Sequence, residues 1–365
     1  MKIKNDFDDL LKIGWNDDFA SLFEPLAGTG LEPARVVIQL RDLSTIISRS
    51  GELDAGVSGR FRHRAGSRSE FPTVGDWVAV EPCGDGRGVI HTVLTRKSAF
   101  VRKAAGPETE AQVVAANIDT VFLITGLDGN FNLSRIERYL TAAWDSGASP
   151  VIVLNKSDLR QDLDRIVADV EQIALGIPVV AVSAREGSNL SSLEPFLEPG
   201  RTVALLGPSG VGKSSLINRL LGEDRLRTNP VRDDDSRGRH TTTHRELVRL
   251  PGGALLIDTP GMRELQLWTE DESLDRSFDD IVGLANTCRF PDCRHELEPG
   301  CSVRSAIENG TLDPRRFANY LKQRKELKYL ALKQEEHGLR RSEKEFGRRI
   351  SGLMKDVKNR KLRYR

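Results

Sequence analysis

A glycine-rich run at residues 207–215, Gly-Pro-Ser-Gly-Val-Gly-Lys-Ser-Ser, has the spacing of a phosphate-binding loop. An apolar stretch precedes it and a helix-like stretch follows it, which is the context such a loop needs. Its backbone N–H groups would point at phosphate oxygens, Lys213 would reach the β- and γ-phosphates, and the Ser214 hydroxyl would bind Mg²⁺. The predicted nucleotide contacts are Gly207, Pro208, Ser209, Gly210, Val211, Gly212, Lys213, Ser214 and Ser215.

Two polar segments upstream of this loop have residue types that read a guanine base. Each ends an apolar run, and together they supply Asn155, Lys156, Ser157, Asp158, Ser183 and Ala184. The Asp158 carboxylate can accept hydrogen bonds from guanine N1–H and the 2-amino group, which adenine does not offer. We expect Asn155 to brace the loop, Lys156 to cover the base plane, and the Ala184 N–H to meet guanine O6. The pair of segments therefore favours GTP over ATP.

Two further segments are typical of nucleotide-sensing switches. Asp258 ends the apolar run 254–257 and precedes Thr-Pro-Gly, so we expect it to bind Mg²⁺ through water and Gly261 to contact the γ-phosphate. The polar stretch 233–247 is expected to be the first switch, with one of Thr241–Thr243, and by preference Thr242, completing the magnesium shell. Mg²⁺ bound to GTP by Ser214 and Thr242 is thus a predicted cofactor.

The residue after Asp-Thr-Pro-Gly is Met262, where some GTPases have a glutamine that orients the attacking water. A methionine side chain cannot hydrogen-bond water usefully. His240, in the first switch, is the candidate within the chain, because an imidazole can orient or deprotonate water near neutral pH. The other interpretation, a surface histidine with no catalytic role, remains open.

Three cysteines and one histidine lie close together near the end of the chain. Cys288, Cys293, His295 and Cys301 supply three thiolates and one imidazole within 14 positions. This is the ligand set of a closed, structural Zn²⁺ site, with no open position for catalysis. One structural zinc ion is therefore a predicted cofactor.

The order of these segments along the chain is unusual for a GTPase. The two base-reading segments come first, then the phosphate loop and the two switches, whereas a G domain ordinarily begins with the phosphate loop. A circular permutation explains this order, because the termini of a domain often lie close together at its surface. The cut also brings Met262 to within about 26 residues of Cys288, and we expect the second switch to contact the metal-binding unit.

The elements that must position these residues fall into two patterns. Five short β-rich runs lie between Arg35 and about Lys103: RVVIQL, LSTIIS, SGRFRHR, DWVAVEP and GVIHTVLTR. They predict a five-stranded oligonucleotide-binding (OB) barrel. From about residue 117, apolar runs alternate with helical patterns at 133–147 and 163–176, which indicates a parallel, doubly wound α/β sheet.

The segment 62–72 between two of the barrel runs has four basic side chains and an aromatic one. Basic groups hold phosphates and an aromatic ring can stack on a base, so the segment can bind RNA. An ordinary charged hairpin tip explains the pattern equally well.

Composition and charge limit the class of protein. The 365 residues are 38% hydrophobic and 29% charged, and no apolar run approaches the roughly 20 residues of a membrane span. Acidic residues near the N-terminus argue against a secretion signal. We therefore expect a cytoplasmic protein that does not bind a membrane. Four cysteines do not make a disulfide framework here, and Cys83 is expected to be buried.

The charge is uneven along the chain. Residues 315–365 contain 18 Lys and Arg against 6 Asp and Glu, although the whole chain has a net charge of +1. This asymmetry indicates a polyanion partner such as nucleic acid. A solvated helix with a lysine-rich face is the alternative.

With these motifs together, the chain resembles the ribosome small-subunit-dependent GTPase A family, bacterial circularly permuted GTPases of small-subunit maturation. The segments NKSD, GPSGVGKSS, GRHTTT, DTPGM and CRFPDCRHELEPGC each match the family pattern. The resemblance implies a multidomain fold: an OB-type β-barrel, a circularly permuted α/β P-loop G domain and an α-helical zinc-binding C-terminal domain. The expected boundaries are 1–33 for an N-terminal extension, 34–104 for the RNA-binding barrel, 112–282 for the GTPase domain and 283–365 for the zinc domain with its basic tail.

The resemblance also implies the activity and the partners. The protein is expected to be a monomer that binds the small ribosomal subunit and its rRNA, hydrolyses GTP to GDP with stimulation by the subunit, and couples hydrolysis to release late in maturation. Two alternatives stay open: a signalling or transport GTPase with a protein partner, and a GTP-sensing RNA-binding scaffold with little hydrolysis.

Overall fold

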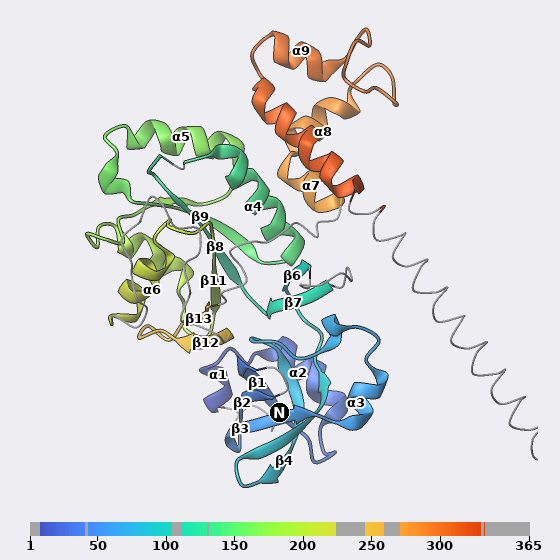
Figure 1. Cartoon of the computed structure of the whole chain (residues 1–365), viewed down its shortest axis with the longest axis vertical. Helices are drawn as coiled ribbons and strands as arrows, with labels where there is room; N and C mark the ends of the chain where they lie inside the picture. Colours follow the sequence, from blue (N-terminus) through green and yellow to red (C-terminus); the bar gives the residue numbers. More distant parts are fainter. Residues whose placement is uncertain are drawn as a thin grey trace, which may run out of the picture.

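The computed structural model describes residues 8–40, 43–103, 111–129, 131–223, 245–258, 271–329 and 332. A β-barrel, a central α/β sheet and a helical unit follow one another along the chain (Figure 1). Within these residues, no helix combines the length and apolar character that crossing a bilayer requires.

The barrel has five strands, the number that the sequence predicts. They are β1 (Glu32–Gln39), β2 (Ser44–Ser48), β3 (Gly51–Val57), β4 (Trp77–Gly84) and β5 (Arg87–Val93). The order β1-β2-β3-β5-β4 closes because β4 also pairs with β1, and only β3 and β5 run parallel. This OB-type barrel encloses its own apolar core of Ala34, Val36, Ile46, Leu53, Ala55, Val78, Val80 and Ile90.

The third predicted strand, SGRFRHR, is wrong: residues 59–64 form helix α3 (Gly59–Arg64). Ser58 starts the helix because its hydroxyl accepts a hydrogen bond from the Phe61 N–H at 3.0 Å. The actual strand is β3, whose Leu53 and Ala55 alternate inward among polar and glycine residues. Cys83, expected to be buried, is exposed near the end of β4, where that strand extends past the barrel core.

The N-terminal helices α1 (Asp8–Leu11) and α2 (Asp17–Phe23), with the short η2 (Glu24–Leu26), do more than lead into the barrel. Trp15 packs edge-on against Trp77 of β4, with ring centroids 4.7 Å apart. Phe19 and Phe23 join the same buried cluster. The sequence pattern predicts a short polar segment with some helix here, but it does not predict this packing against the barrel.

A buried arginine fastens this extension to the barrel and the central sheet. Arg35 of β1 is 1% exposed and donates to the carbonyl oxygens of Ile13, Gly75 and Asn117 and to Thr202 Oγ1. Burial lowers the pKa of its guanidinium to about 10. The four partners come from distant parts of the chain, so Arg35 fixes how the barrel sits against the sheet.

The central sheet is the predicted parallel, doubly wound one. Its strands lie in the order β10 (Val179–Ala181), β9 (Ser149–Asn155), β8 (Thr120–Gly126), β11 (Thr202–Leu206), β13 (Leu255–Asp258) and β12 (Arg245–Arg249). All pairings are parallel except that of β12 with β13. Strand β12 has no counterpart among the predicted strands.

Alternate residues of these strands face two helical layers. On one face, Leu123 and Ile152 share a core with α4 (Leu133–Ser146) and α5 (Leu163–Ile173). On the other, Phe122 and Val153 pack with α6 (Lys213–Leu221) and η5 (Leu190–Phe196). The base-reading loop, the Ser-Ala segment and the phosphate loop each follow the carboxyl end of one of these strands, β9, β10 and β11 respectively.

The barrel and the central sheet are continuous through one strand pairing. Strand β12 pairs with β1, with Ile38 opposite Glu246 and Gln39 opposite Arg245, which gives a single 11-stranded sheet. A separate hairpin of β6 (Ala99–Lys103) and β7 (Ala111–Ala116) connects the two bodies. The predicted boundary between residues 104 and 112 falls inside this hairpin.

The helical unit contains α7 (Asp271–Ser277), α8 (Asp279–Asn286), α9 (Ser302–Glu308) and a helix at residues 314–329. Leu274 and Phe278 pack with Phe317 and Tyr320 in a core of their own. Leu274, Phe278 and Ile281, which precede the predicted boundary at 283, therefore pack with the Cys-bearing segment.

Candidate functional site

The base-reading loop, the phosphate loop and the Ser-Ala segment meet at one buried side chain. Asn155, the last residue of β9, is 2% exposed. Its Nδ2 donates to the Val211 carbonyl at 2.8 Å, and its Oδ1 accepts from the Ala184 N–H at 3.0 Å. Val211 and Ala184, which are 56 and 29 positions from Asn155 in the sequence, are thus brought to the same edge of the sheet. This is what the predicted bracing role of Asn155 requires.

Asp158 lies exposed beside this brace, in the short helix η4 (Ser157–Leu159). Its Oδ1 accepts a hydrogen bond from the Ser183 hydroxyl at 2.5 Å. A carboxylate has about four acceptor positions, so this bond orients Asp158 and leaves it able to accept from a base. The Ala184 N–H, which is predicted to meet guanine O6, donates to Asn155 Oδ1 in this structure.

Lys156 takes the left-handed backbone conformation, with φ of 65°, and its Nζ lies 2.6 Å from Asp128 Oδ2. Both side chains are about three-quarters buried. Asp128 follows β8 and precedes α4, and the sequence analysis did not single it out. Asp128 could have been identified from its position in the sequence. It comes two residues after a buried strand, and the next strand along the chain ends in the base-reading loop.

The phosphate loop curls tightly between β11 and α6. A Cβ at Gly207 would overlap the Ile124 carbonyl, and one at Gly212, where φ is +92°, would overlap Asn155 Nδ2. Glycine is required at both positions for these close approaches. The Lys213 ammonium folds back onto the Gly207 and Pro208 carbonyls, at 2.6 and 2.5 Å.

The first helix after the loop also supports the Ser-Ala segment. Arg219 of α6 donates from Nε to the Ala184 carbonyl at 3.0 Å and from Nη2 to the Arg185 carbonyl at 2.7 Å. The phosphate-loop helix therefore holds the base-reading side of the site in place. Sequence reasoning missed Arg219, because nothing in its spacing marks it.

Several predicted site residues lie outside the described residues: Thr242, His240, Gly261 and Met262. For Asp258 the structure describes the backbone, at the end of β13 and opposite Glu246. Ser214 lies at the start of α6, next to Lys213. The arrangement of the magnesium shell thus remains a prediction.

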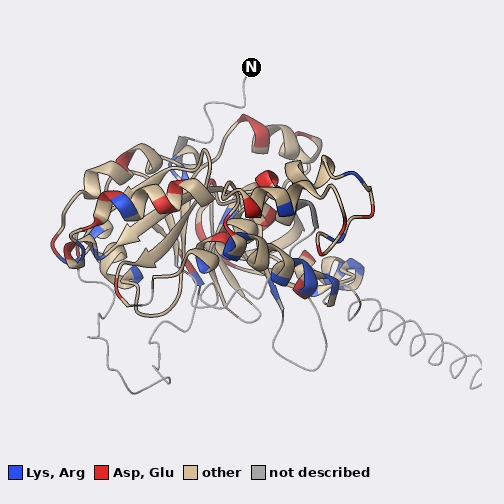
Figure 2. Ribbon diagram, turned by 90° about the horizontal axis from the view of Figure 1, so that it is seen from above, with Lys and Arg blue, Asp and Glu red and all other residues tan. Residues whose placement is uncertain are grey.

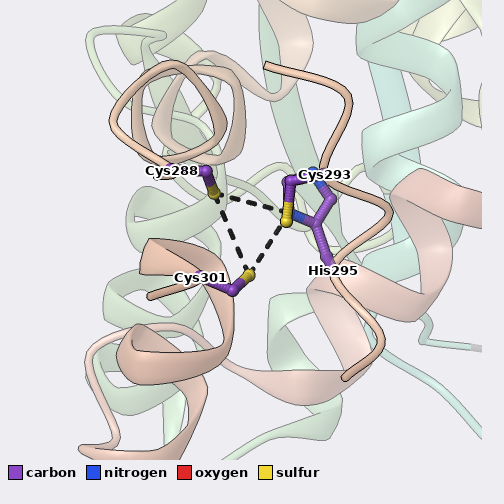
Figure 3. A group of neighbouring side chains, drawn as sticks. All are labelled: Cys288, Cys293, His295 and Cys301. Atoms are coloured by element: carbon purple, nitrogen blue, oxygen red, sulfur yellow. Dashed lines mark hydrogen bonds between the residues drawn. The ribbon is translucent and has the colours of Figure 1, made fainter. Parts of the chain in front are cut away.

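The four metal-binding candidates of the helical unit face one another (Figure 3). Their ligand atoms all lie within 4.8 Å of one another. Cys288 and Cys301 Sγ are 3.9 Å apart, and His295 Nδ1 lies 3.6 and 3.4 Å from them. Tetrahedral zinc with Zn–S bonds near 2.3 Å separates thiolates by about 3.8 Å, so these side chains fit such an ion.

The helical unit docks on α4 through a second buried cluster. Arg316 donates from Nη1 to Glu137 Oε1 and from Nε and Nη2 to the Asp280 carboxylate. Asn319 also donates to Glu137. Because α7 contacts α4 and begins directly after residues 259–270, the segment of the second switch leads into this interface.

Comparison with known proteins finds relatives that cover most of the chain. The family model described as RsgA GTPase matches residues 93–268. The small ribosomal subunit biogenesis GTPase RsgA of Opitutus terrae is 52% identical over 332 residues, 88% of this chain and 90% of that protein. The protein of that name from Streptomyces coelicolor is 43% identical, covering 93% and 92%.

Two solved structures share the architecture. YjeQ from Thermotoga maritima superposes with a TM-score of 0.63 at 30% identity, over 81% of this chain and 98% of that one. YloQ, described as a circularly permuted GTPase, superposes with a TM-score of 0.60 at 23% identity, over 82% and 95%. The permuted order of the G domain, expected from the sequence, is confirmed.

Proposed function

The chain belongs to the RsgA GTPase family and is a GTP hydrolase, and from this premise we propose that it acts in maturation of the small ribosomal subunit. It binds the subunit late in assembly, hydrolyses GTP to GDP and phosphate with stimulation by the subunit, and couples hydrolysis to release. The names of its relatives, small ribosomal subunit biogenesis GTPase, support this assignment.

The observation that carries the nucleotide chemistry is the Asn155 brace. It joins base-reading and phosphate-binding loops that the permuted order separates, so one nucleotide can span both. We assign guanine recognition to Asp158, phosphate binding to the 207–215 loop, and Mg²⁺ binding to Ser214 and Thr242. Asp258 binds the same ion through water, and the Gly261 N–H senses the γ-phosphate.

The water-orienting group is proposed to be His240, because Met262 cannot fill that role. His240→Ala then lowers GTP turnover in the presence of small subunits by about 100-fold, the usual contribution of a general base. His244→Ala, in the same segment, is the matched control and leaves turnover unchanged. Equal turnover of the two variants would remove His240 from the mechanism.

The partner surfaces are proposed from charge. Figure 2 shows Lys and Arg positions along the helix at 314–329, where Lys322, Arg324, Lys325 and Lys328 are exposed. Such a basic face neutralises phosphates and gives salt-dependent binding. We propose that this face and the barrel contact rRNA, that zinc holds the Cys–His unit in shape, and that the protein works in the cytoplasm as a monomer.

Phosphate release measured with and without purified small subunits tests the assignment. We expect slow turnover alone and strong stimulation by subunits, together with tighter subunit binding in the GTP-analogue state than with GDP. Nucleotide-dependent RNA binding without stimulated phosphate release would instead indicate the GTP-sensing scaffold. Equal subunit affinity in both nucleotide states would contradict the coupling to release.

A further inference from the structure

A small pocket opens on the barrel between α3 and β5. It has a volume of about 270 Å³, and Phe61, Val93 and Leu94 form its apolar lining. Phe61 and Leu94 are each 6% exposed and belong to the buried interior of the protein. A volume just below the usual range for ligand pockets suits one ring system rather than a whole nucleotide.

The walls of this pocket are fixed before any ligand binds. Arg96 donates to the carbonyls of Ser69 and Phe71, at 2.6 and 2.9 Å, and makes two bonds of 2.8 Å to the fully buried Asp76. Glu70, which also lines the pocket, is held by its Oε1, which accepts from the N–H groups of Gly66 and Ser67 at 3.0 and 3.2 Å. Little ordering entropy is therefore lost when the pocket is filled.

The rim of the pocket is cationic. Arg64 lines it and is exposed, and among the residues that the structure describes its guanidinium has neither a hydrogen bond nor an ion pair. Arg60 and Arg62 are exposed on the same short helix, and Glu70 is the only acidic residue in 59–72. A ligand that suits this site is planar, has polar edges, and is attached to a negative charge.

We propose that this pocket captures one unstacked nucleobase of single-stranded RNA, with the adjoining phosphate on Arg64. The inference rests on the proposed function, because it presupposes that the barrel binds RNA. The apolar lining desolvates the ring, while the Thr92 hydroxyl and the Glu70 carboxylate can meet its polar edge. This favours the RNA-binding interpretation of segment 62–72 and names the element responsible.

The test uses the full-length protein and short single-stranded RNAs with 2-aminopurine at a central position. Capture of that base changes its fluorescence, and anisotropy gives the affinity at several salt concentrations. Ala65→Leu, which fills the cavity without changing charge, should lower affinity about tenfold, abolish the fluorescence change and keep the salt slope. Arg64→Gln should reduce that slope by about 0.7, as expected for one lost phosphate contact on a single strand.

Controls separate the pocket from the general charge of the barrel. Arg62→Gln, on the same helix but outside the pocket, keeps the 2-aminopurine signal. Thr92→Leu fills the cavity from a different element, strand β5, and must reproduce Ala65→Leu. Subunit-independent GTP turnover is measured to confirm that both variants are folded. None of the pocket residues belongs to the nucleotide loops.

The outcomes distinguish the inference from the function on which it rests. If the filled variants bind RNA and report on 2-aminopurine as the wild type does, the pocket is not a base site, although the RNA-binding assignment stands. If they lose affinity for small subunits only, with the RNA signals unchanged, the occupant is a ribosomal protein and the inference is wrong. If the wild type binds no RNA and no subunits, both proposals fail.

Discussion

Arg316 Nη1 lies 2.5 Å from Glu137 Oε1, and both side chains are almost entirely buried, at 10% and 3% exposed. This pair joins the helical unit to α4, with Asp280 as the second acidic partner of Arg316. An arginine placed between two carboxylates of different elements holds those elements in one relative orientation. The Cys–His unit is thus docked against the helix that follows β8 of the nucleotide-binding sheet.

Removing Arg316 tests the strength of that docking. Arg316→Gln leaves Glu137 buried without a cation, and breaking a buried pair in this way costs about 3 kcal/mol. The loss should appear as a lower midpoint of urea unfolding and as early proteolytic release of the helical unit. Arg315→Gln, next to it and exposed, is the matched control and should behave like the wild type. Equal stability of the two variants would show that apolar contacts alone dock the unit.

The same interface predicts that the stability of the protein depends on pH. Burial raises the pKa of the Glu137 carboxyl above its ordinary 4.5, against the opposing pull of Arg316 and Asn319. The native state then holds this proton more tightly than the unfolded state does. The resulting stabilisation is present below about pH 4.5 and is lost as pH rises through the folded-state pKa.

Glu137→Gln cannot titrate, so the thermal midpoint of the variant should improve relative to the wild type as pH rises from 4.5 towards 7. Glu326→Gln at the half-exposed Arg138 pair of the same interface serves as the comparison. The raised pKa of Glu137 would be contradicted if the thermal midpoint of Glu137→Gln, relative to that of the wild type, stayed constant or fell as pH rises.

Much of this architecture could be predicted from the sequence. Buried parallel strands read as apolar runs, so β8, β9 and β11 and the loops at their ends were found from local pattern. Strand β3 was missed because its inward residues, Leu53 and Ala55, alternate with polar and glycine residues that resemble a turn. The neighbouring helix α3 was taken for a strand because its single buried apolar residue, Phe61, shows no helical period.

Residues that act through tertiary contacts could not be found in the same way. Arg219, Asp128 and Glu137 are ordinary charged residues of helices and loops in the sequence. Their roles follow only from the close approach of distant segments, such as Glu137 and Arg316, which are 179 positions apart in the sequence. The metal ligands, in contrast, were identifiable because their chemistry and short spacing are themselves informative.

The join between β12 and β1 predicts communication between the first switch and the barrel. Arg245 Nη1 donates to Gln39 Oε1 at 2.8 Å, and Gln39 Nε2 donates to the Pro72 carbonyl at 2.9 Å. Gln39→Leu removes this link and leaves the Arg245 guanidinium, whose pKa burial already lowers to about 10, without its side-chain acceptor.

We expect Gln39→Leu to leave subunit-independent GTP turnover unchanged while the ratio of subunit affinities with GTP analogue and GDP falls about fivefold. Gln112→Leu, which removes a similar contact to Arg102 in the β6–β7 hairpin, is the matched control. An unchanged affinity ratio would indicate that the barrel does not sense the nucleotide through this strand.

The Cys–His cluster predicts one tightly held zinc ion per chain. Cys288→Ser should abolish zinc in metal analysis, because the site has no spare ligand, and should unfold the helical unit at lower temperature. Cys83→Ser changes a thiol that is exposed in the barrel and should retain the full zinc content. Loss of zinc from both variants, or from neither, would disprove the ligand assignment.

Asp128 is predicted to affect how tightly the nucleotide is bound, and not which base is preferred. Its ion pair with Lys156, in which both side chains are about three-quarters buried, positions the lysine stem that is expected to cover the base plane. Asp128→Asn should weaken GDP binding about fivefold, corresponding to the loss of one such pair. The preference for GDP over inosine diphosphate should not change, because Asp158, and not Lys156, recognises the 2-amino group.

Asp162→Asn, which removes the exposed partner of Arg160 on the same side of the sheet, should leave both affinities unaltered. Isothermal titration calorimetry compares the affinity of each variant with that of the wild type, once for GDP and once for inosine diphosphate. If Asp128→Asn reduced the difference in affinity between GDP and inosine diphosphate, Lys156 would have to orient Asp158 as well as the base.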